Sequence, residues 1–202
     1  MRIGIVDYDA GNLTSVETAL RRIGADFFTT ADPDAIFEAD RVVFPGVGEA
    51  RAAMEVLNAR GLSEALRRYA DSGRLILGIC VGAQVILDAS DERDVSCLAL
   101  IPGRARRFPV SELKVPQIGW NGVEHDNQAL FAGVPSGGEF YFVHSYYPAP
   151  AETRDTIGWT EYGVRFASAF RRDNVYAVQF HPEKSGPYGL RVLTNFITMK
   201  EQ

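Results

Sequence analysis

Short continuous runs of hydrophobic residues alternate along this chain with stretches in which hydrophobic residues recur every three or four positions. In the first hundred residues the runs predict buried strands at residues 2–8, 27–30, 41–44 and 75–77. The spaced stretches predict helices at residues 13–23, 49–58 and 63–72, and a short helix that starts at Asp32 and Pro33. Strands that alternate with helices predict a mostly parallel sheet with helices on both faces.

The pattern changes after Ile101, where the predicted strands follow one another more closely and Gly, Pro and aromatic residues become more frequent. Candidate strands are residues 104–108, 139–147, 156–162, 165–170 and 175–180. Residues 171–174 are typical of a hairpin turn, and the hydrophobic spacing predicts a last helix over residues 188–198. We therefore predict one α/β domain over residues 1–202, with a mostly parallel sheet flanked by helices and an antiparallel extension in its C-terminal half.

Composition and charge narrow the classes of function. The 202 residues are 46% hydrophobic and 23% charged, and the net charge of −5 argues against nucleic acid as the main ligand. The two cysteines, Cys80 and Cys97, are too few for a disulfide framework. Because the N-terminus is typical of a strand and no apolar stretch is long enough to span a membrane, we expect a cytoplasmic protein with no membrane partner.

Cys80 lies where a predicted strand turns sharply into a predicted helix. Gly78 and Gly82 stand two residues before and after it, which allows a tight corner of the kind that carries a nucleophile. The helix start beside the sulfur would favour its thiolate form and would offer N–H groups to an anion. The simpler interpretation, a buried cysteine in a core strand, is equally compatible with this stretch alone.

Other segments supply the groups that a cysteine nucleophile needs. His181 follows a predicted strand, and Glu183 stands two residues later, so that one could act as a base and the other could orient it. Gly46, Val47 and Gly48 follow another strand and could present N–H groups to an oxyanion, although they could equally form a plain turn. No cluster of residues has the spacing of a metal site, and no dinucleotide or phosphate-loop motif is present, so we expect no metal and no cofactor.

The chain resembles the triad, or class I, glutamine amidotransferases in two separated motifs, GICVGAQ at residues 78–84 and FHPE at residues 180–183. Members of this family release ammonia from glutamine on a flavodoxin-like α/β core. Further segments resemble the glutaminase subunits of imidazole glycerol phosphate synthases in histidine biosynthesis, namely IVDY with GNL, PGVG, KVPQIGWN, YFVHSY and QFHPEKS. This resemblance extends from the first predicted strand to the last predicted helix.

The resemblance implies roles for particular residues. Cys80 would attack the side-chain amide of glutamine, His181 would carry protons, and Glu183 would hold His181. The backbone N–H groups of Val81 and of Gly46, Val47 and Gly48 would form the oxyanion hole. Five residues match positions at the glutamine-binding site: Gln84, Glu92, His144, Ser145 and Tyr146.

The resemblance also implies a partner, the (β/α)8-barrel cyclase subunit, in a heterodimer that makes imidazole glycerol phosphate and aminoimidazole carboxamide ribotide from the ammonia. Asn12, Trp120 and Lys184 match positions that face this barrel. Two alternatives remain open. The same glutaminase chemistry could serve another acceptor, as in a paralogue for sugar amidation or pyridoxal phosphate synthesis, or the chain could be a catalytically silent binding subunit, against which the intact triad argues.

Overall fold

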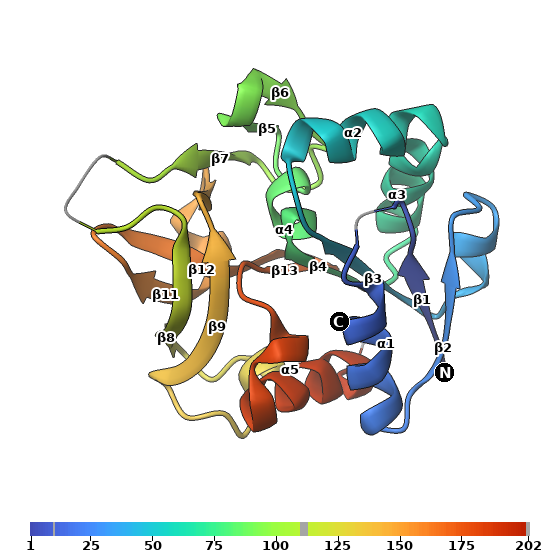
Figure 1. The fold of residues 1–202 in the computed structure, drawn as a ribbon. Coiled ribbons are helices and arrows are strands. Elements are labelled where there is room, and N and C mark those ends of the chain that lie inside the picture. The colour runs from blue at the N-terminus through green and yellow to red at the C-terminus, as the bar shows by residue number, and fades with distance from the viewer. Residues whose placement is uncertain (10, 110–112, 201–202) are drawn as a thin grey trace.

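A nine-stranded sheet runs through the part of the chain that the computed structural model describes, residues 1–9, 11–109 and 113–200 (Figure 1). Its first five strands in spatial order are parallel: β2 (Asp26–Thr30), β1 (Arg2–Val6), β3 (Arg41–Gly46), β4 (Ile76–Cys80) and β13 (Val175–Val178). Every residue of β3, β4 and β13 is buried, as expected for strands covered on both faces. The predicted parallel core is therefore confirmed.

The sheet continues as an antiparallel extension, which confirms the change of pattern in the C-terminal half. The added strands are β12 (Arg165–Arg172), β11 (Thr156–Glu161), β8 (Gln117–His125) and β9 (Gly138–His144). Their core face is aromatic, and Phe142 and Phe166 pack edge to face with ring centroids 6.1 Å apart. The predicted hairpin turn lies between β12 and β13, where Asp173 has a φ of 52°.

Helices cover both faces of the parallel half, with α1 and α5 on one face and α2, α3 and α4 on the other (Figure 1). They are α1 (Leu13–Arg22), α2 (Ala50–Ala59), α3 (Leu62–Asp71), α4 (Val81–Val85) and α5 (Gly186–Thr198). In α1 the buried residues Val16, Ala19 and Leu20 lie on one stripe, which is the pattern that the sequence shows. The short 3₁₀ helices are η1 (Ala35–Glu38), η2 (Glu92–Asp94), η3 (Ala129–Phe131), η4 (Thr153–Asp155) and η5 (Pro182–Lys184).

One predicted strand was wrong, and strand β8 was missed. The predicted strand at residues 139–147 is two strands, since β9 ends at His144 and β10 (Tyr146–Pro150) joins a second, four-stranded sheet. The other strands of that sheet are β7 (Gly103–Arg107), β5 (Ala89–Ser90) and β6 (Val95–Ser96). Strand β8 was not predicted, because it contains Gly119 and Gly122, which are unfavourable in strands, and its burial does not alternate regularly.

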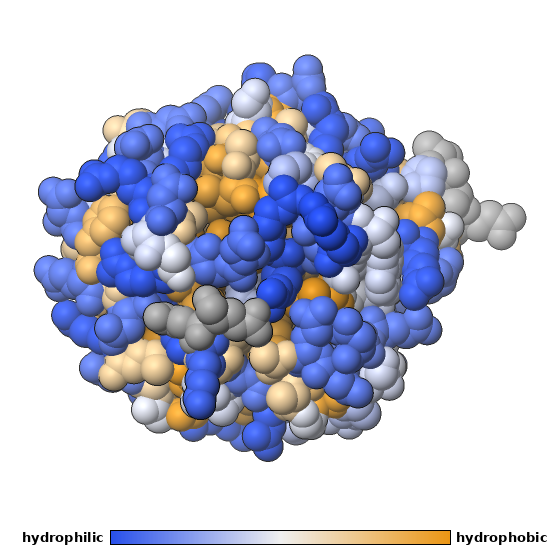
Figure 2. Space-filling view, turned by 180° about the vertical axis from the view of Figure 1, so that it is seen from behind, coloured by the Kyte–Doolittle hydropathy of each residue, from blue (hydrophilic) through white to orange (hydrophobic). Residues whose placement is uncertain are grey.

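Seen from behind, the surface is mainly hydrophilic, with hydrophobic residues in small separate groups (Figure 2). Within the described residues, no helix is long and apolar enough to cross a membrane.

Candidate active site

Cys80 ends β4 in a strained conformation, with φ 56° and ψ −110°, immediately before α4 begins at Val81. Positive φ is unusual for a residue with a side chain and is found at sharp strand-to-helix corners that present a nucleophile. The corner requires its flanking glycines. A Cβ on Gly82 would lie 2.0 Å from the carbonyl oxygen of Phe44, and one on Gly78 would lie 2.4 Å from Ile86. The structure therefore favours a functional corner over a plain core cysteine.

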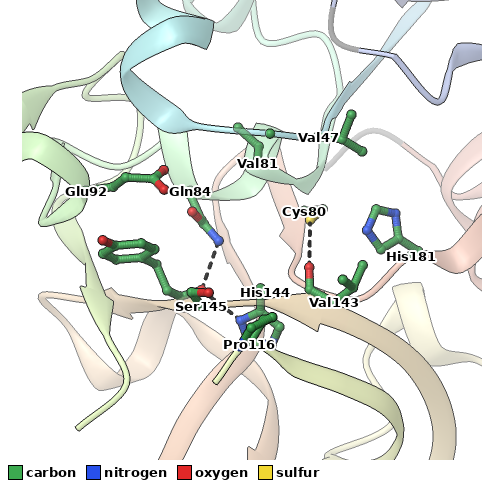
Figure 3. A pocket seen from close by; sticks show the side chains of 12 residues that line it. Val47, Cys80, Val81, Gln84, Glu92, Pro116, Val143, His144, Ser145 and His181 are labelled. Atoms are coloured by element: carbon green, nitrogen blue, oxygen red, sulfur yellow. Dashed lines mark hydrogen bonds between the residues drawn. The ribbon is translucent and has the colours of Figure 1, made fainter. Parts of the chain in front are cut away.

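His181 and Glu183 approach Cys80 from the loop that follows β13, the neighbour of β4 in the sheet. His181 Nδ1 donates to Glu183 Oε1 over 2.7 Å, and both side chains are almost completely buried. The second ring nitrogen, Nε2, has no hydrogen-bond partner among the described residues. In Figure 3 the ring lies beside the Cys80 sulfur, with one nitrogen directed toward it. The three groups predicted from separate motifs are thus adjacent.

Burial of His181 disfavours its charged form, but its interactions with the nearby Cys80 and Glu183 outweigh this and raise the pKa of His181 to about 10. The imidazolium is therefore the favoured form of His181 beside Cys80 and Glu183. A cysteine paired with a protonated histidine is an activated nucleophile, because the thiolate attacks carbonyl carbons and the thiol does not.

Two further groups contact the Cys80 sulfur. The Gln179 side chain donates to Sγ at 3.6 Å, and Sγ lies 4.0 Å from the Val143 carbonyl oxygen (Figure 3). Gln179 is fully buried on the loop between β13 and His181, and its Oε1 accepts from the Gln84 amide at 2.9 Å. Sequence reasoning did not assign it a role. The available signal was a polar residue in an otherwise apolar run two positions before His181.

The loop that follows β3 borders the sulfur on another side. Gly46 is paired with Cys80 in the register of β3 and β4, so the two backbones lie next to each other. A Cβ on Gly46 would lie 2.2 Å from the Tyr8 hydroxyl and 2.7 Å from the Gly82 nitrogen. Only glycine fits there. The end of β3 and the start of the loop that follows it therefore lie close to the nucleophile.

These elements enclose a cavity of about 260 Å³ with Cys80 and His181 on its wall (Figure 3). The sequence predicted most of its lining, namely Val47, Gly48, Val81, Gln84, Glu92, His144, Ser145 and Tyr146. Gly46, which was also predicted, is not among the lining residues, and Pro116 and Val143 are additional wall residues. The volume is below that of sites for drug-sized ligands and suits a small metabolite.

The chain matches the family model described as "Glutamine amidotransferase class-I" over residues 5–199. It is a class-I glutamine amidotransferase. Among its curated relatives is the imidazole glycerol phosphate synthase subunit HisH of Herpetosiphon aurantiacus, which is 48% identical over 198 residues, 98% of this chain and 94% of the relative. The subunit of the same name from Chloroflexus aurantiacus is 46% identical over 204 residues, 98% of this chain and 96% of the relative.

Solved structures of other amidotransferases share the fold. PurLQS of Thermotoga maritima superimposes with a TM-score of 0.75 at 16% identity, over 97% of both chains. A glutamine amidotransferase of Thermotoga maritima gives a TM-score of 0.67 at 18% identity, over 98% of this chain and 80% of that one. The flavodoxin-like α/β class expected from the sequence is therefore confirmed.

In this amidotransferase, two of the side chains predicted to bind glutamine also form hydrogen bonds with the backbone of the pocket wall. Gln84 Nε2 donates to the Tyr146 carbonyl oxygen and to Gln179, each at 2.9 Å. His144 Nδ1 donates to the same Tyr146 oxygen at 2.7 Å, and burial lowers the pKa of His144 to about 4. A neutral His144 cannot compete with His181 as the protonated partner of the thiolate. Its position instead fixes the turn between β9 and β10.

The three residues predicted to face a partner occupy different environments. Asn12 Nδ2 donates to Glu183 Oε1 at 2.6 Å, so this side chain contacts the triad carboxylate directly. Trp120 is 51% exposed on β8, and Lys184 is exposed on η5 next to Glu183. The Asn12 contact could not be predicted from the sequence, because 171 positions separate the two residues.

Tyr8 is a second residue that sequence reasoning left without a role. Its hydroxyl lies under Gly46, is buried, and has no hydrogen-bond partner among the described residues. Burial raises the pKa of Tyr8 well above its ordinary value, and the nearby Cys80 charge adds to this. The phenol therefore stays neutral beside Cys80. Elsewhere in the described part of the chain, no group of three or more His, Cys, Asp or Glu residues has the arrangement of a metal site.

Proposed function

We propose that this class-I glutamine amidotransferase is the glutaminase subunit of an imidazole glycerol phosphate synthase, and that it acts in the cytoplasm as one domain. It would hydrolyse glutamine to glutamate and ammonia and deliver the ammonia to a cyclase subunit in histidine biosynthesis. Relatives of that name at 46–48% identity over 98% of this chain support the assignment. The observation that carries the chemistry is the buried Cys80, His181 and Glu183 constellation on the wall of a small pocket.

The three triad groups can hydrolyse glutamine in two steps, through a thioester on Cys80. The Cys80 thiolate attacks the side-chain amide carbon of glutamine, which forms a C–S bond and moves the carbonyl electron pair onto oxygen. When the adduct collapses, the C–N bond breaks, and the His181 imidazolium donates a proton to the leaving nitrogen, which departs as ammonia. His181 then removes a proton from water, which attacks the thioester and releases glutamate with the thiolate.

The residues around the triad would stabilise the charged groups that form during the reaction. Glu183 accepts a hydrogen bond from His181 Nδ1–H and so stabilises the imidazolium, and Asn12 donates to the same carboxylate oxygen. The N–H groups of Val81 and of the loop formed by Gly46, Val47 and Gly48 would stabilise the tetrahedral oxyanion. The remaining wall, with Gln84, Glu92, His144, Ser145 and Tyr146, would hold the amino-acid end of glutamine.

Exposed hydrophobic side chains near the triad loop support docking of a partner subunit. Ile118 and Trp120 stand two positions apart on β8 and therefore point to the same face, and they are 63% and 51% exposed. Trp120 packs on Tyr141, whose backbone N–H donates to Ser185 Oγ beside Lys184. Exposed apolar side chains of this size, bordered by a lysine, are typical of an interface. We assign this face to the (β/α)8-barrel cyclase.

Co-purification with candidate cyclase subunits, followed by an assay on the formimino-ribotide substrate, tests the function. We expect synthesis of imidazole glycerol phosphate with either glutamine or ammonia as the nitrogen source. Cys80→Ala should abolish the glutamine-dependent reaction and leave the ammonia-dependent reaction intact. Loss of both activities would contradict the assignment of glutamine hydrolysis to this subunit and of synthesis to the cyclase. Turnover only with a different nitrogen acceptor would assign the chain to another pathway.

A further inference from the structure

Gln179 is a buried amide beside the nucleophile that does not belong to the triad. Strand β13 ends at Val178, whose partner in the parallel register with β4 is Ile79. The residues that follow them, Gln179 and Cys80, are therefore neighbours at the ends of two adjacent strands. The backbone N–H of Gln179 donates to the Ser168 carbonyl oxygen on β12 at 2.8 Å. The sheet thus holds Gln179 next to the sulfur from a rigid position.

The hydrogen bonds of the neighbouring amide decide which end of Gln179 faces the sulfur. The Tyr146 carbonyl oxygen can only accept, so the Gln84 atom that contacts it at 2.9 Å is the nitrogen Nε2. The same nitrogen contacts Gln179 at 2.9 Å, and this contact is therefore made by the oxygen Oε1. The NH2 group of Gln179 is then the group that lies 3.6 Å from the Cys80 sulfur. Both glutamines are buried, at 0% and 3% exposure, so water does not compete for these bonds.

The other groups around the sulfur act in both directions. The His181 imidazolium stabilises the thiolate, whereas the Val143 carbonyl oxygen, 4.0 Å from Sγ, accepts from the thiol S–H and stabilises the protonated form. Among the other titratable groups of the site, Tyr8 and His144 are neutral, and Glu92 on the pocket wall can only disfavour a negative sulfur. An additional N–H donor therefore shifts the balance toward the nucleophilic form.

We propose that Gln179 is a further catalytic residue, which donates a side-chain N–H to the Cys80 sulfur and stabilises the thiolate that attacks the substrate. Gln84 is the positioning residue that keeps the amide in this orientation. The inference rests on the proposed function where it takes glutamine as the substrate of this thiolate. Because the amide is neutral, it favours the thiolate without adding a second acid that would compete with His181 for the leaving nitrogen.

Alkylation by iodoacetamide at a series of pH values measures the sulfur independently of glutamine turnover, because the thiolate reacts and the thiol does not. The midpoint of the resulting profile is compared between proteins. Mass spectrometry of peptides separates Cys80 from Cys97, the other cysteine, whose pKa is raised by burial to about 11. The two sulfurs are therefore followed separately in one sample.

Two variants remove the donor in different ways. Gln179→Met has a side chain of similar length with no N–H group. Gln179→Glu keeps an oxygen that accepts from Gln84 and places a second oxygen at the sulfur. Ser168→Ala is the matched control, because it removes a buried hydroxyl, which accepts from Thr160 at 2.9 Å, from the strand next to β13, and Ser168 does not line the pocket.

For Gln179→Met we expect the alkylation midpoint of Cys80 to rise by about 0.5–1.5 pH units, the effect of losing one hydrogen bond to a group that is charged in one form only. Gln179→Glu should raise it at least as far, since an oxygen at this place repels the thiolate. In the complex with the cyclase, kcat/KM of Gln179→Met for glutamine should fall about 3- to 30-fold at pH values below the midpoint. The difference should narrow as the pH rises, because the sulfur is then a thiolate in both proteins. Ser168→Ala should leave the midpoint unchanged.

Two results would overturn the inference. The first is an unchanged midpoint in Gln179→Met, or in Gln179→Glu if the methionine variant does not melt cooperatively. The second is a loss of kcat/KM by the same factor at every pH, which is the sign of a purely structural defect. Failure of the proposed function is distinguishable, because the unchanged complex would then not hydrolyse glutamine, whereas the alkylation midpoints report on the sulfur whatever the substrate is.

Discussion

Gly46→Ala is the substitution for which the structure gives the sharpest prediction. The new Cβ would lie 2.2 Å from the Tyr8 hydroxyl, 2.7 Å from the Gly82 nitrogen and 2.9 Å from the Val81 Cβ. All three distances are below those that real Cβ atoms tolerate, and the Gly82 nitrogen belongs to the backbone of the nucleophile corner. Either β3 or this corner must move.

Overpacking of a buried site of this kind costs about 2–3 kcal/mol. In a domain of this size, that loss lowers the melting temperature by about 5–10 °C. A displacement approaching 1 Å between the loop and Cys80 would also lower kcat/KM for glutamine by up to about 100-fold. Calorimetry and a glutamate-release assay measure the two effects.

Tyr8→Phe provides the control, because it removes the atom closest to the new Cβ. The hydroxyl has no hydrogen-bond partner among the described residues, so its loss alone should change stability little. We expect the double variant to recover part of the stability lost in Gly46→Ala, with a coupling energy above about 0.5 kcal/mol. The Gly82 and Val81 contacts remain and keep the recovery incomplete. Normal melting and turnover of Gly46→Ala, or strict additivity with Tyr8→Phe, would refute this reasoning.

Three further predictions test other parts of the site. Glu183→Gln should lower kcat by about 10³- to 10⁴-fold, as conversion of the triad carboxylate to an amide does in serine proteases, and turnover within tenfold of the unchanged protein would contradict its role. His144, with its pKa near 4 when folded and 6.5 when unfolded, should make stability fall as pH drops from 6.5 to 4, by about 3 kcal/mol. In urea unfolding, the stability of His144→Asn should fall less between pH 6.5 and pH 4 than that of the unchanged protein. The same pH dependence in both proteins would contradict this role of His144. Trp120→Ala should leave the melting temperature unchanged and weaken cyclase binding by about 30-fold or more in titration calorimetry, whereas unchanged affinity would place the interface elsewhere.

Most regular elements could be predicted from the sequence, because their patterns are local. The continuous apolar runs of β1, β3 and β4 and the helical spacing in α1 follow from which side chains each element must bury. The division at Ser145 could not be predicted, since nothing local shows that the chain passes from one sheet to another. The two-residue strands β5 and β6 are likewise stabilised by pairing with distant segments and not by their own composition.

The candidate site also combines features set by local sequence with contacts set by the tertiary structure. The sequence by itself determined the chemical groups and the two corners that carry them, because the order Gly-Ile-Cys-Val-Gly and the spacing of His181 and Glu183 are short-range features. Only the tertiary structure decided which residues meet there: Gln179 at the sulfur, Asn12 at Glu183, and Glu92 at the start of α2. These contacts join positions 42 to 171 residues apart, and the packing of neighbouring strands and loops, not any local pattern, brings them within hydrogen-bonding distance.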